Sequence, residues 1–230
     1  MKNLFQRNLT FLSPIIFILV WEFLSRTALI DPRFFPPPTL IIGALFSMAK
    51  SGTLYTHLSI SLLRIILGFL AGAIPAVSLG LFMGMYRTFR SFLSPLIMAL
   101  MPIPTLALLP VIVLLFGIGE ASKIITIASS VFFPVVINTT LGVVNINRVY
   151  VDVAKNYNAS PKDFFFQIAL PGALPVMMEG IQMGQAIALL TIVAAEMIGA
   201  QSGIGYLIWT SYKLFVFPSM YVGIILISFF

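Results

Sequence analysis

Few side chains in this 230-residue sequence are of a type that carries out chemistry, and most of them stand alone between apolar runs. There is no cysteine and only one histidine, His57, which excludes thiol catalysis, disulfide bonds and metal sites built from several histidines. The tripeptides Gly-Lys-Ser and Gly-Lys-Thr, which end the usual phosphate-binding loop of ATPases, do not occur. An enzyme would therefore lack its catalytic residues, and any use of ATP requires a partner chain.

The remaining polar side chains suit the passage of a solute better than catalysis. Glu179, Gln182 and Gln185 recur at three-residue intervals, which places them on one helix face. Such a stripe either lines a path or forms hydrogen bonds between helices. Arg64 lies inside an apolar run, where it either reaches back to the lipid headgroups or contacts a solute or a helix partner.

Prolines interrupt one long apolar run, at positions 95, 102, 104 and 110. A proline removes a backbone hydrogen bond, so the freed carbonyls need protein or a water-filled path beside them. Residues 95–110, with Pro102 and Pro104, are therefore a candidate path wall.

The elements that position these side chains are membrane helices. The sequence is 60% hydrophobic and 9% charged, against roughly 25% charged residues in a soluble domain. A surface this poor in charge excludes an ordinary cytosolic enzyme and a disordered chain. The 13 Lys and Arg residues are scattered singly, which indicates markers of membrane topology and no contact with nucleic acid.

We expect an all-α integral membrane protein whose single transmembrane domain covers residues 1–230. The six expected spans are about 9–30, 58–86, 92–117, 122–144, 172–198 and 218–230. The last run has 13 residues, too few to cross the membrane, so we expect the chain to be cut within its final helix. A short amphipathic interfacial helix is expected over Thr39–Met48, and residues 199–217 are expected to be a semi-polar connection.

The positive charges favour a cytoplasmic N-terminus. With that orientation, the inner side receives Lys2, Arg7, Arg87, Arg90, Arg148, Lys155 and Lys162. The outer side receives Arg26, Arg33, Lys50, Arg64, Lys123 and Lys213.

Residues 145–171 form the longest polar segment and predict a helix–turn–helix on the inner face. Asp152 is expected at the start of the first helix, where an acid meets the positive end of the helix dipole. Asn158 suits a left-handed turn, and Ser160 suits the cap of a second helix. That helix is expected to end at Leu170-Pro171. Its expected exposed apolar side chains are Phe164, Phe165, Phe166 and Ile168. A hairpin resting on lipid is the alternative.

This segment resembles the cytoplasmic signature of the permease subunits of binding-protein-dependent ABC importers. The signature reads Glu-Ala-Ala, three residues, Gly, nine residues, Ile, any residue, Leu-Pro. Here Asp152-Val153-Ala154 is followed at the same spacing by Asn158 and by Ile168-Ala169-Leu170-Pro171. Asp replaces Glu, and Asn replaces Gly. The resemblance implies a type I importer permease fold with a coupling loop at about 148–170 that seats on an ATPase. The implied coupling residues are Asp152, Ala154, Asn158, Ser160, Phe164, Phe165, Ile168, Leu170 and Pro171.

Further segments are similar to one branch of these permeases, which carries nitrate, sulfonates, taurine, bicarbonate or thiamine-precursor pyrimidines. They are Ser61–Phe69, Pro102-Ile103-Pro104, Phe116–Glu120, Ala194–Ile198 and Gln201–Gly205. Glu196 lies in one of them and is the expected structural or gating acid.

The resemblance implies a bacterial inner-membrane subunit that is not an enzyme and holds no cofactor of its own. Its implied partners are a second permease chain, two ATPase subunits that bind ATP and Mg²⁺, an extracytoplasmic binding protein and membrane lipid. The expected cargo is a small anion. The alternatives are a neutral or zwitterionic cargo and an ion-coupled secondary carrier, although carriers of that kind usually show internal repeats, which we do not find here.

Overall fold

The computed structural model describes residues 2–229, with side chains described from residue 12 onward. Lys2 and Arg7, used to orient the chain, and Phe230, at its expected cut end, therefore lie outside the described side chains. Every regular element within residues 2–229 is a helix, as expected. The chain divides into two compact units, Met1–Ile60 with Gln201–Phe230, and Ser61–Ala200.

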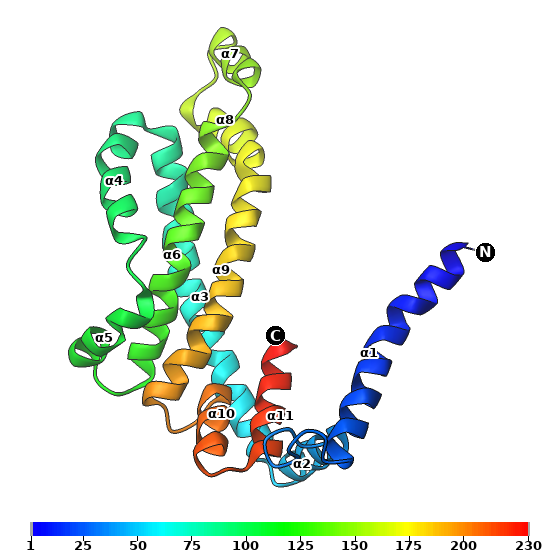
Figure 1. Ribbon diagram of the computed structural model, residues 1–230. Helices are drawn as coiled ribbons and strands as arrows, with labels where there is room; N and C mark the ends of the chain where they lie inside the picture. Colours follow the sequence, from blue (N-terminus) through cyan, green and yellow to red (C-terminus); the bar gives the residue numbers. More distant parts are fainter. Residues whose placement is uncertain (1, 230) are drawn as a thin grey trace. The chain divides into compact units, whose positions relative to one another are not determined.

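Three helices form the core of the Ser61–Ala200 unit: α3 (Thr53–Met85), α6 (Glu120–Val144) and α9 (Leu170–Gly199), with α6 between the other two (Figure 1). A side chain on Gly72 of α3 would overlap the backbone of Ala128 in α6. On the other side, a Cβ at Gly180 of α9 would lie 2.5 Å from the Cβ of Asn138. Small residues thus allow the close helix approach that is typical of membrane proteins.

Much of the interior of this unit is apolar. Ile127, Val131 and Val135 of α6 and Ile192 of α9 are all 0% exposed. Most of the buried hydroxyls have a hydrogen-bond partner, as where Thr191 donates from its Oγ1 to Ser130 Oγ at 3.1 Å, in keeping with the rule that a polar group away from water needs one. The Oγ1 of Thr139 is buried without a partner among the described residues.

Among the described residues, three helices are long and apolar enough to cross a membrane. They are Thr53–Met85, Glu120–Val144 and Pro161–Gly199. A fourth span results if α4 (Arg87–Leu100) and the segment Thr105–Phe116 count together. The helical membrane architecture is confirmed, and the count of six spans stays a prediction.

The expected break in the third span is present, and its helix begins at Arg87, earlier than the predicted residue 92. α4 and the following segment, made of η1 (Thr105–Leu108) and α5 (Leu109–Phe116), are bent by 81° relative to each other. The bend falls where Pro102 and Pro104 remove backbone donors.

The other unit contains four helices of its own: α1 (Lys2–Arg26), α2 (Pro38–Lys50), α10 (Ile204–Lys213) and α11 (Phe217–Ser228). α2 matches the short helix predicted at Thr39–Met48. The prediction that residues 199–217 form only a connection is wrong, because they contain α10. The glycines that suggested a loop lie at its start, where Gly203 has a φ of +118°. The rest of α10 packs against α11.

Polar contacts fix the link between α1 and α2. Glu22 accepts hydrogen bonds from the backbone N and the Oγ1 of Thr39, at 3.0 and 2.8 Å, and pairs with Arg26. In the loop, Arg33 donates to Asp31 at 2.9 Å. These hydrogen bonds from Arg33 hold the pKa of the Asp31 carboxyl below its usual value.

Candidate functional site

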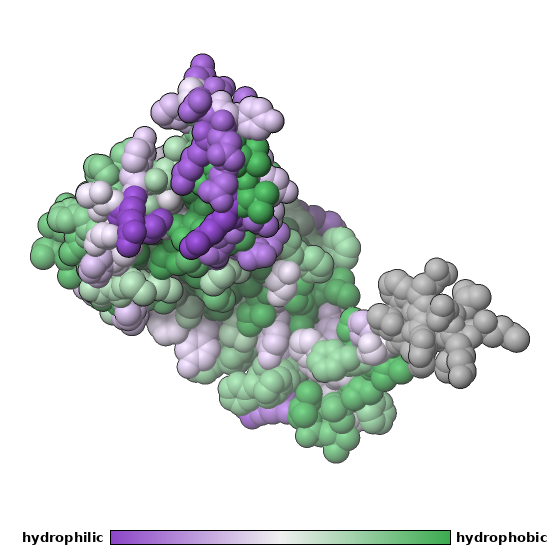
Figure 2. All heavy atoms as spheres, turned by 90° about the horizontal axis from the view of Figure 1, so that it is seen from above, coloured by the Kyte–Doolittle hydropathy of each residue, from purple (hydrophilic) through white to green (hydrophobic). Residues whose placement is uncertain are grey.

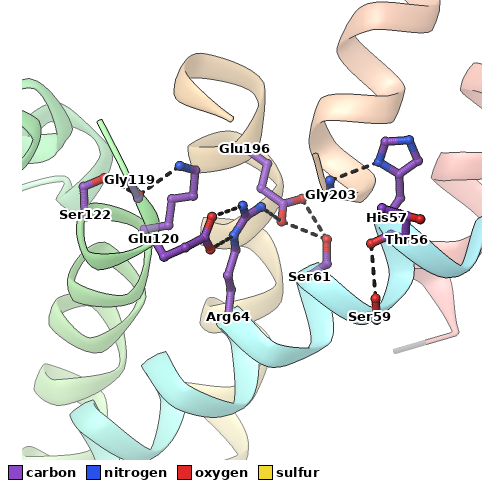
Figure 3. Close-up of polar contacts among 11 residues, drawn as sticks. Thr56, His57, Ser59, Ser61, Arg64, Gly119, Glu120, Ser122, Glu196 and Gly203 are labelled. Atoms are coloured by element: carbon purple, nitrogen blue, oxygen red, sulfur yellow. Dashed lines mark hydrogen bonds and ion pairs between the residues drawn. The ribbon is translucent and has the colours of Figure 1, made fainter. Parts of the chain in front are cut away.

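The Ser61–Ala200 unit carries charged or polar groups at both ends of its helices. α6 and α9 run in opposite directions and are joined by the loop that contains α7 (Arg148–Asn156) and α8 (Pro161–Phe164) (Figure 1). At the far end, where α6 begins and α9 ends, charged side chains form a cluster that is buried except for Glu120 (Figure 3).

Arg64 of α3 is the centre of this cluster, and its side chain is 1% exposed. Its Nε and Nη2 donate to the two carboxylate oxygens of Glu120 at 2.5 and 2.6 Å. Its Nη1 donates to Oε1 of Glu196 at 2.7 Å. One guanidinium thus joins carboxylates from the start of α6 and the end of α9.

Two further polar side chains complete the surroundings. Ser61, one helical turn before Arg64, donates to both oxygens of Glu196, at 2.8 and 2.9 Å. Lys123 is 4% exposed and donates from Nζ to the backbone oxygen of Gly119 at 2.9 Å. Arg64 and Lys123 balance the two glutamates, so the cluster has no net formal charge.

Arg64 was expected either to reach the lipid headgroups or to contact a solute or a helix partner, and its contacts decide between these alternatives. The side chain does not reach out to lipid headgroups but binds partners on two other helices. The electrostatic reason is that a buried guanidinium is strongly destabilised unless carboxylates face it. Glu196, expected to be a structural or gating acid, lies 2.7 Å from Arg64 in the same cluster. Glu120 was not among the candidate site residues, although it ends the quoted segment Phe116–Glu120.

The polar stripe on α9 is separate from this cluster. Glu179, Gln182 and Gln185 are all exposed. They lie on the opposite side of α9 from Gly180 and Gly184, which face α6. Gln185 and Glu196 are separated by about 16 Å along the helix, at 1.5 Å per residue. The stripe therefore faces outward from this unit.

The proline-rich segment borders a cavity of about 370 Å³ between α3, α4 and α6. Its lining is mostly apolar and includes Met83, Ser94, Ile97, Met98, Met101 and Val136. Pro102 and Pro104 are exposed and are not part of this lining. Of the proposed path wall 95–110, Ile97, Met98 and Met101 line this cavity.

At the other end of the unit, α7 begins earlier than predicted. Asn147 caps it by accepting a hydrogen bond from the backbone N of Val149 at 3.0 Å, and the helix starts at Arg148. Asp152 is the fifth residue of the helix, so the expectation that it lies at the helix start is wrong. The helix starts after the cap that Asn147 supplies, and Asp152 lies in its second turn.

The turn after α7 has the predicted left-handed residue, since Asn158 has a φ of +51°. The backbone N of Asn158 donates to the Lys155 oxygen at 3.0 Å, and that of Ala159 donates to the Ala154 oxygen at 2.9 Å. This pair of bonds is the Schellman motif that ends many helices.

The second helix of the loop starts as predicted but does not end as predicted. Ser160 Oγ accepts from the backbone N of Asp163 at 3.2 Å, and Pro161 occupies the first turn. After Phe164 the chain continues as η2, a π-helical turn over Phe165–Ala169. It then passes directly into α9 at Leu170-Pro171, so the helix does not end there. The expected helix end is therefore wrong, because the wider turn accommodates the missing donor of Pro171.

Phe164 and Phe165 do not form the expected exposed surface. Both pack against a buried cluster of Leu81, Val143, Ala169 and Ala173. Phe166 is 56% exposed and Ile168 is half-buried. The large exposed apolar side chains of α7 and its turn are instead Val149, Tyr150, Val153 and Tyr157. Their spacing of three, four and seven residues was the signal in the sequence for this surface.

We call Val149, Tyr150, Val153 and Tyr157 the α7 face. Figure 2 looks onto this end of the unit, where hydrophilic residues gather over the loop and hydrophobic residues surround them. The α7 face thus belongs to a loop that is rich in hydrophilic residues. Among residues 2–229, no group of three or more His, Cys, Asp or Glu side chains is arranged to hold a metal ion.

Comparison with known proteins places the chain among transport proteins. A family model described as "Binding-protein-dependent transport system inner membrane component" matches residues 66–230. The taurine transport system permease protein TauC of Escherichia coli (strain K12) is 34% identical, over 93% of this chain and 79% of its own length. Putative aliphatic sulfonates transport permease proteins SsuC are similarly related. The SsuC protein of the same Escherichia coli strain is 35% identical, over 93% of this chain and 81% of its own length. The SsuC protein of Bacillus subtilis (strain 168) is 33% identical, over 94% of this chain and 79% of its own length.

Proposed function

Since this chain belongs to the family of binding-protein-dependent transport system inner membrane components, we propose that it translocates a small sulfonate by a mechanism driven by ATP. It is a multi-pass inner membrane permease of the ABC type, in the taurine and aliphatic sulfonate branch. The sequence left several anions open as the cargo. We choose a sulfonate because the names of these relatives mention taurine or aliphatic sulfonates. None of these three names mentions nitrate or bicarbonate.

The coupling to ATP hydrolysis is assigned to the loop between α6 and α9. Tyr150 is 61% and Tyr157 83% exposed, although both are large aromatic side chains next to polar residues. Apolar side chains exposed in this way mark a surface that another protein covers. The partner is an ATPase subunit, because this chain has no phosphate-binding loop of the usual type.

The assembly contains two permease chains, two ATPase subunits and an extracytoplasmic binding protein. Three or four apolar spans among the described residues are few to enclose a path for a charged solute. In a pair of permeases, the exposed stripe of Glu179, Gln182 and Gln185 lines the path between the two copies. Amide groups there supply hydrogen-bond donors to sulfonate oxygens.

The buried cluster serves as a gate at the outer end of the path. Arg64 joins α3 to both α6 and α9, so the three helices move together while its ion pairs are intact. Opening at this end requires the pairs to exchange partners or separate.

Vesicles test this function. The permease is reconstituted with its ATPase and binding protein, and uptake of taurine, ethanesulfonate and nitrate is measured with and without ATP. We expect ATP-dependent uptake of a sulfonate and little uptake of nitrate. Uptake that follows an ion gradient without ATP would show a secondary carrier. Preference for an uncharged pyrimidine over every sulfonate would contradict the assigned cargo.

A further inference from the structure

Glu120 differs from its partner Arg64 in its access to solvent. The Glu120 side chain is 56% exposed, whereas that of Arg64 is 1% exposed. Glu120 covers the guanidinium edge formed by Nε and Nη2, and its own outer surface meets the surroundings. Glu196, the second carboxylate on Arg64, is 1% exposed and is held by Ser61 as well. Of these two carboxylates, Glu120 is the one that is able to swing away without leaving a buried position.

The edge that Glu120 covers has the geometry of an anion site. A guanidinium presents two parallel N–H groups that fit two oxygens of a carboxylate or a phosphate. A sulfonate likewise offers two coplanar oxygens on one tetrahedral centre, with one negative charge. The Glu120 carboxylate therefore occupies the position that the sulfonate group of a cargo molecule would take.

The charges of the cluster support such an exchange. With Glu120 in place, Arg64 and Lys123 balance Glu120 and Glu196. If Glu120 turns outward, the remaining groups have one net positive charge in a poorly solvated place. An incoming monovalent anion restores neutrality, whereas a neutral solute does not.

We propose that Glu120 is a displaceable internal anion, which a sulfonate replaces on the Nε and Nη2 edge of Arg64. This inference rests on the proposed function for its substrate class. No covalent step is involved: two hydrogen bonds to a carboxylate are exchanged for two hydrogen bonds to a sulfonate. The empty site is thereby kept closed and neutral until a cargo anion arrives.

The test measures anion binding directly, on the purified permease–ATPase complex in lipid nanodiscs without binding protein. Methanesulfonate is the probe, and dimethyl sulfone, which has a similar shape and no charge, is the control ligand. Glu120→Gln removes the competing charge, so we expect methanesulfonate to bind at least about tenfold more tightly than to wild type. Dimethyl sulfone should show no gain.

A matched variant tests whether the gain belongs to this site. Asp163→Asn also removes one exposed carboxylate, but at the loop end of the unit, and should leave methanesulfonate affinity at the wild-type value. An equal gain in Asp163→Asn would indicate a general effect of net charge and would overturn the proposal. An unchanged affinity in Glu120→Gln would overturn it as well.

A second variant, Glu120→Asp, allows the test to be made if Glu120→Gln does not fold. Glu120→Asp keeps the charge but shortens the side chain, so its carboxylate competes less well and a smaller gain is expected; no gain at all would overturn the proposal. Wild-type uptake in the vesicle assay distinguishes a failure of the Glu120 proposal from a failure of the proposed transport function. Normal ATP-dependent sulfonate uptake without any gain in the Glu120 variants refutes the displaceable anion alone. Absence of ATP-dependent uptake refutes the proposed function.

Discussion

Arg64 of α3 and Glu196 of α9 form an ion pair of 2.7 Å in which both side chains are 1% exposed, although 132 residues separate them in the sequence. Both helices also pack against α6, and Glu120 at the start of α6 holds the other edge of Arg64. The three helices are thus fastened at one end by a single guanidinium.

Loss of Arg64 should destabilise the protein more than loss of the Glu196 charge. Arg64→Gln removes the cation that faces Glu196 and should cost about 3–5 kcal/mol. Glu196→Gln leaves Arg64 with Glu120 and should cost less. Thermal unfolding of the detergent-solubilised protein measures both. The double variant Arg64→Gln/Glu196→Gln should be more stable than Arg64→Gln alone, and a cost equal to the sum of the single costs would contradict the buried pair.

A charge on the α7 face should weaken the contact with the ATPase. Tyr150→Asp places a carboxylate in an apolar interface, and we expect at least about a hundredfold loss of affinity from the desolvation cost. Asn156→Asp adds the same group to another exposed position of the same helix and is the matched control. Co-purification of the two subunits gives the readout. Equal retention of the ATPase by Tyr150→Asp and by the control would show that the ATPase contacts another surface.

The left-handed conformation of Asn158 predicts how the turn tolerates substitution. Asn158→Gly should be nearly neutral, whereas Asn158→Val should cost about 1–2 kcal/mol because of its branched Cβ. Hydrogen exchange of the Ala159 amide, which donates to Ala154, should become faster in the valine variant. Equal exchange rates in the two variants would be inconsistent with this geometry.

Two glycines should respond in opposite ways to alanine. A Cβ at Gly72 would overlap the Ala128 backbone, and we expect Gly72→Ala to cost about 1–3 kcal/mol as α3 and α6 move apart. Gly43 in α2 has nothing within 4 Å of the position of a Cβ. Gly43→Ala should therefore stabilise by about 0.5–1 kcal/mol. Thermal unfolding decides, and a neutral Gly72→Ala would argue against close packing of the two helices.

The functional unit should contain two permease chains and two ATPase subunits. Native mass spectrometry of the solubilised complex, released from mild detergent, gives its stoichiometry. An active complex with one permease chain would refute the pairing and, with it, the path between two copies.

Features that depend on neighbouring residues could be predicted from the sequence. Uncharged runs located the long helices, and the prolines located the 81° bend. Asn158 and Ser160 were assigned correctly because a left-handed turn and a helix cap are decided within a few residues.

Features that depend on distant residues could not be predicted in this way. Glu120 and Glu196 lie 56 and 132 positions from Arg64, and no local spacing indicates that they meet. The faces of Phe164 and Phe165 were misjudged for a related reason. The π-helical turn that begins at Phe165 changes the number of residues per turn, so regular helical spacing no longer tells which side chains face the core.

The helical continuity from Pro161 to Gly199 has a mechanical consequence. These 39 residues form one unbroken element, about 58 Å long at 1.5 Å per residue. The loop that contains α7 precedes one end of this element, and Glu196 lies near the other end. A tilt of only about 5° displaces one end by about 5 Å relative to the other, which exceeds the length of any hydrogen bond. A small angular movement of this element is therefore sufficient to separate Glu196 from Arg64.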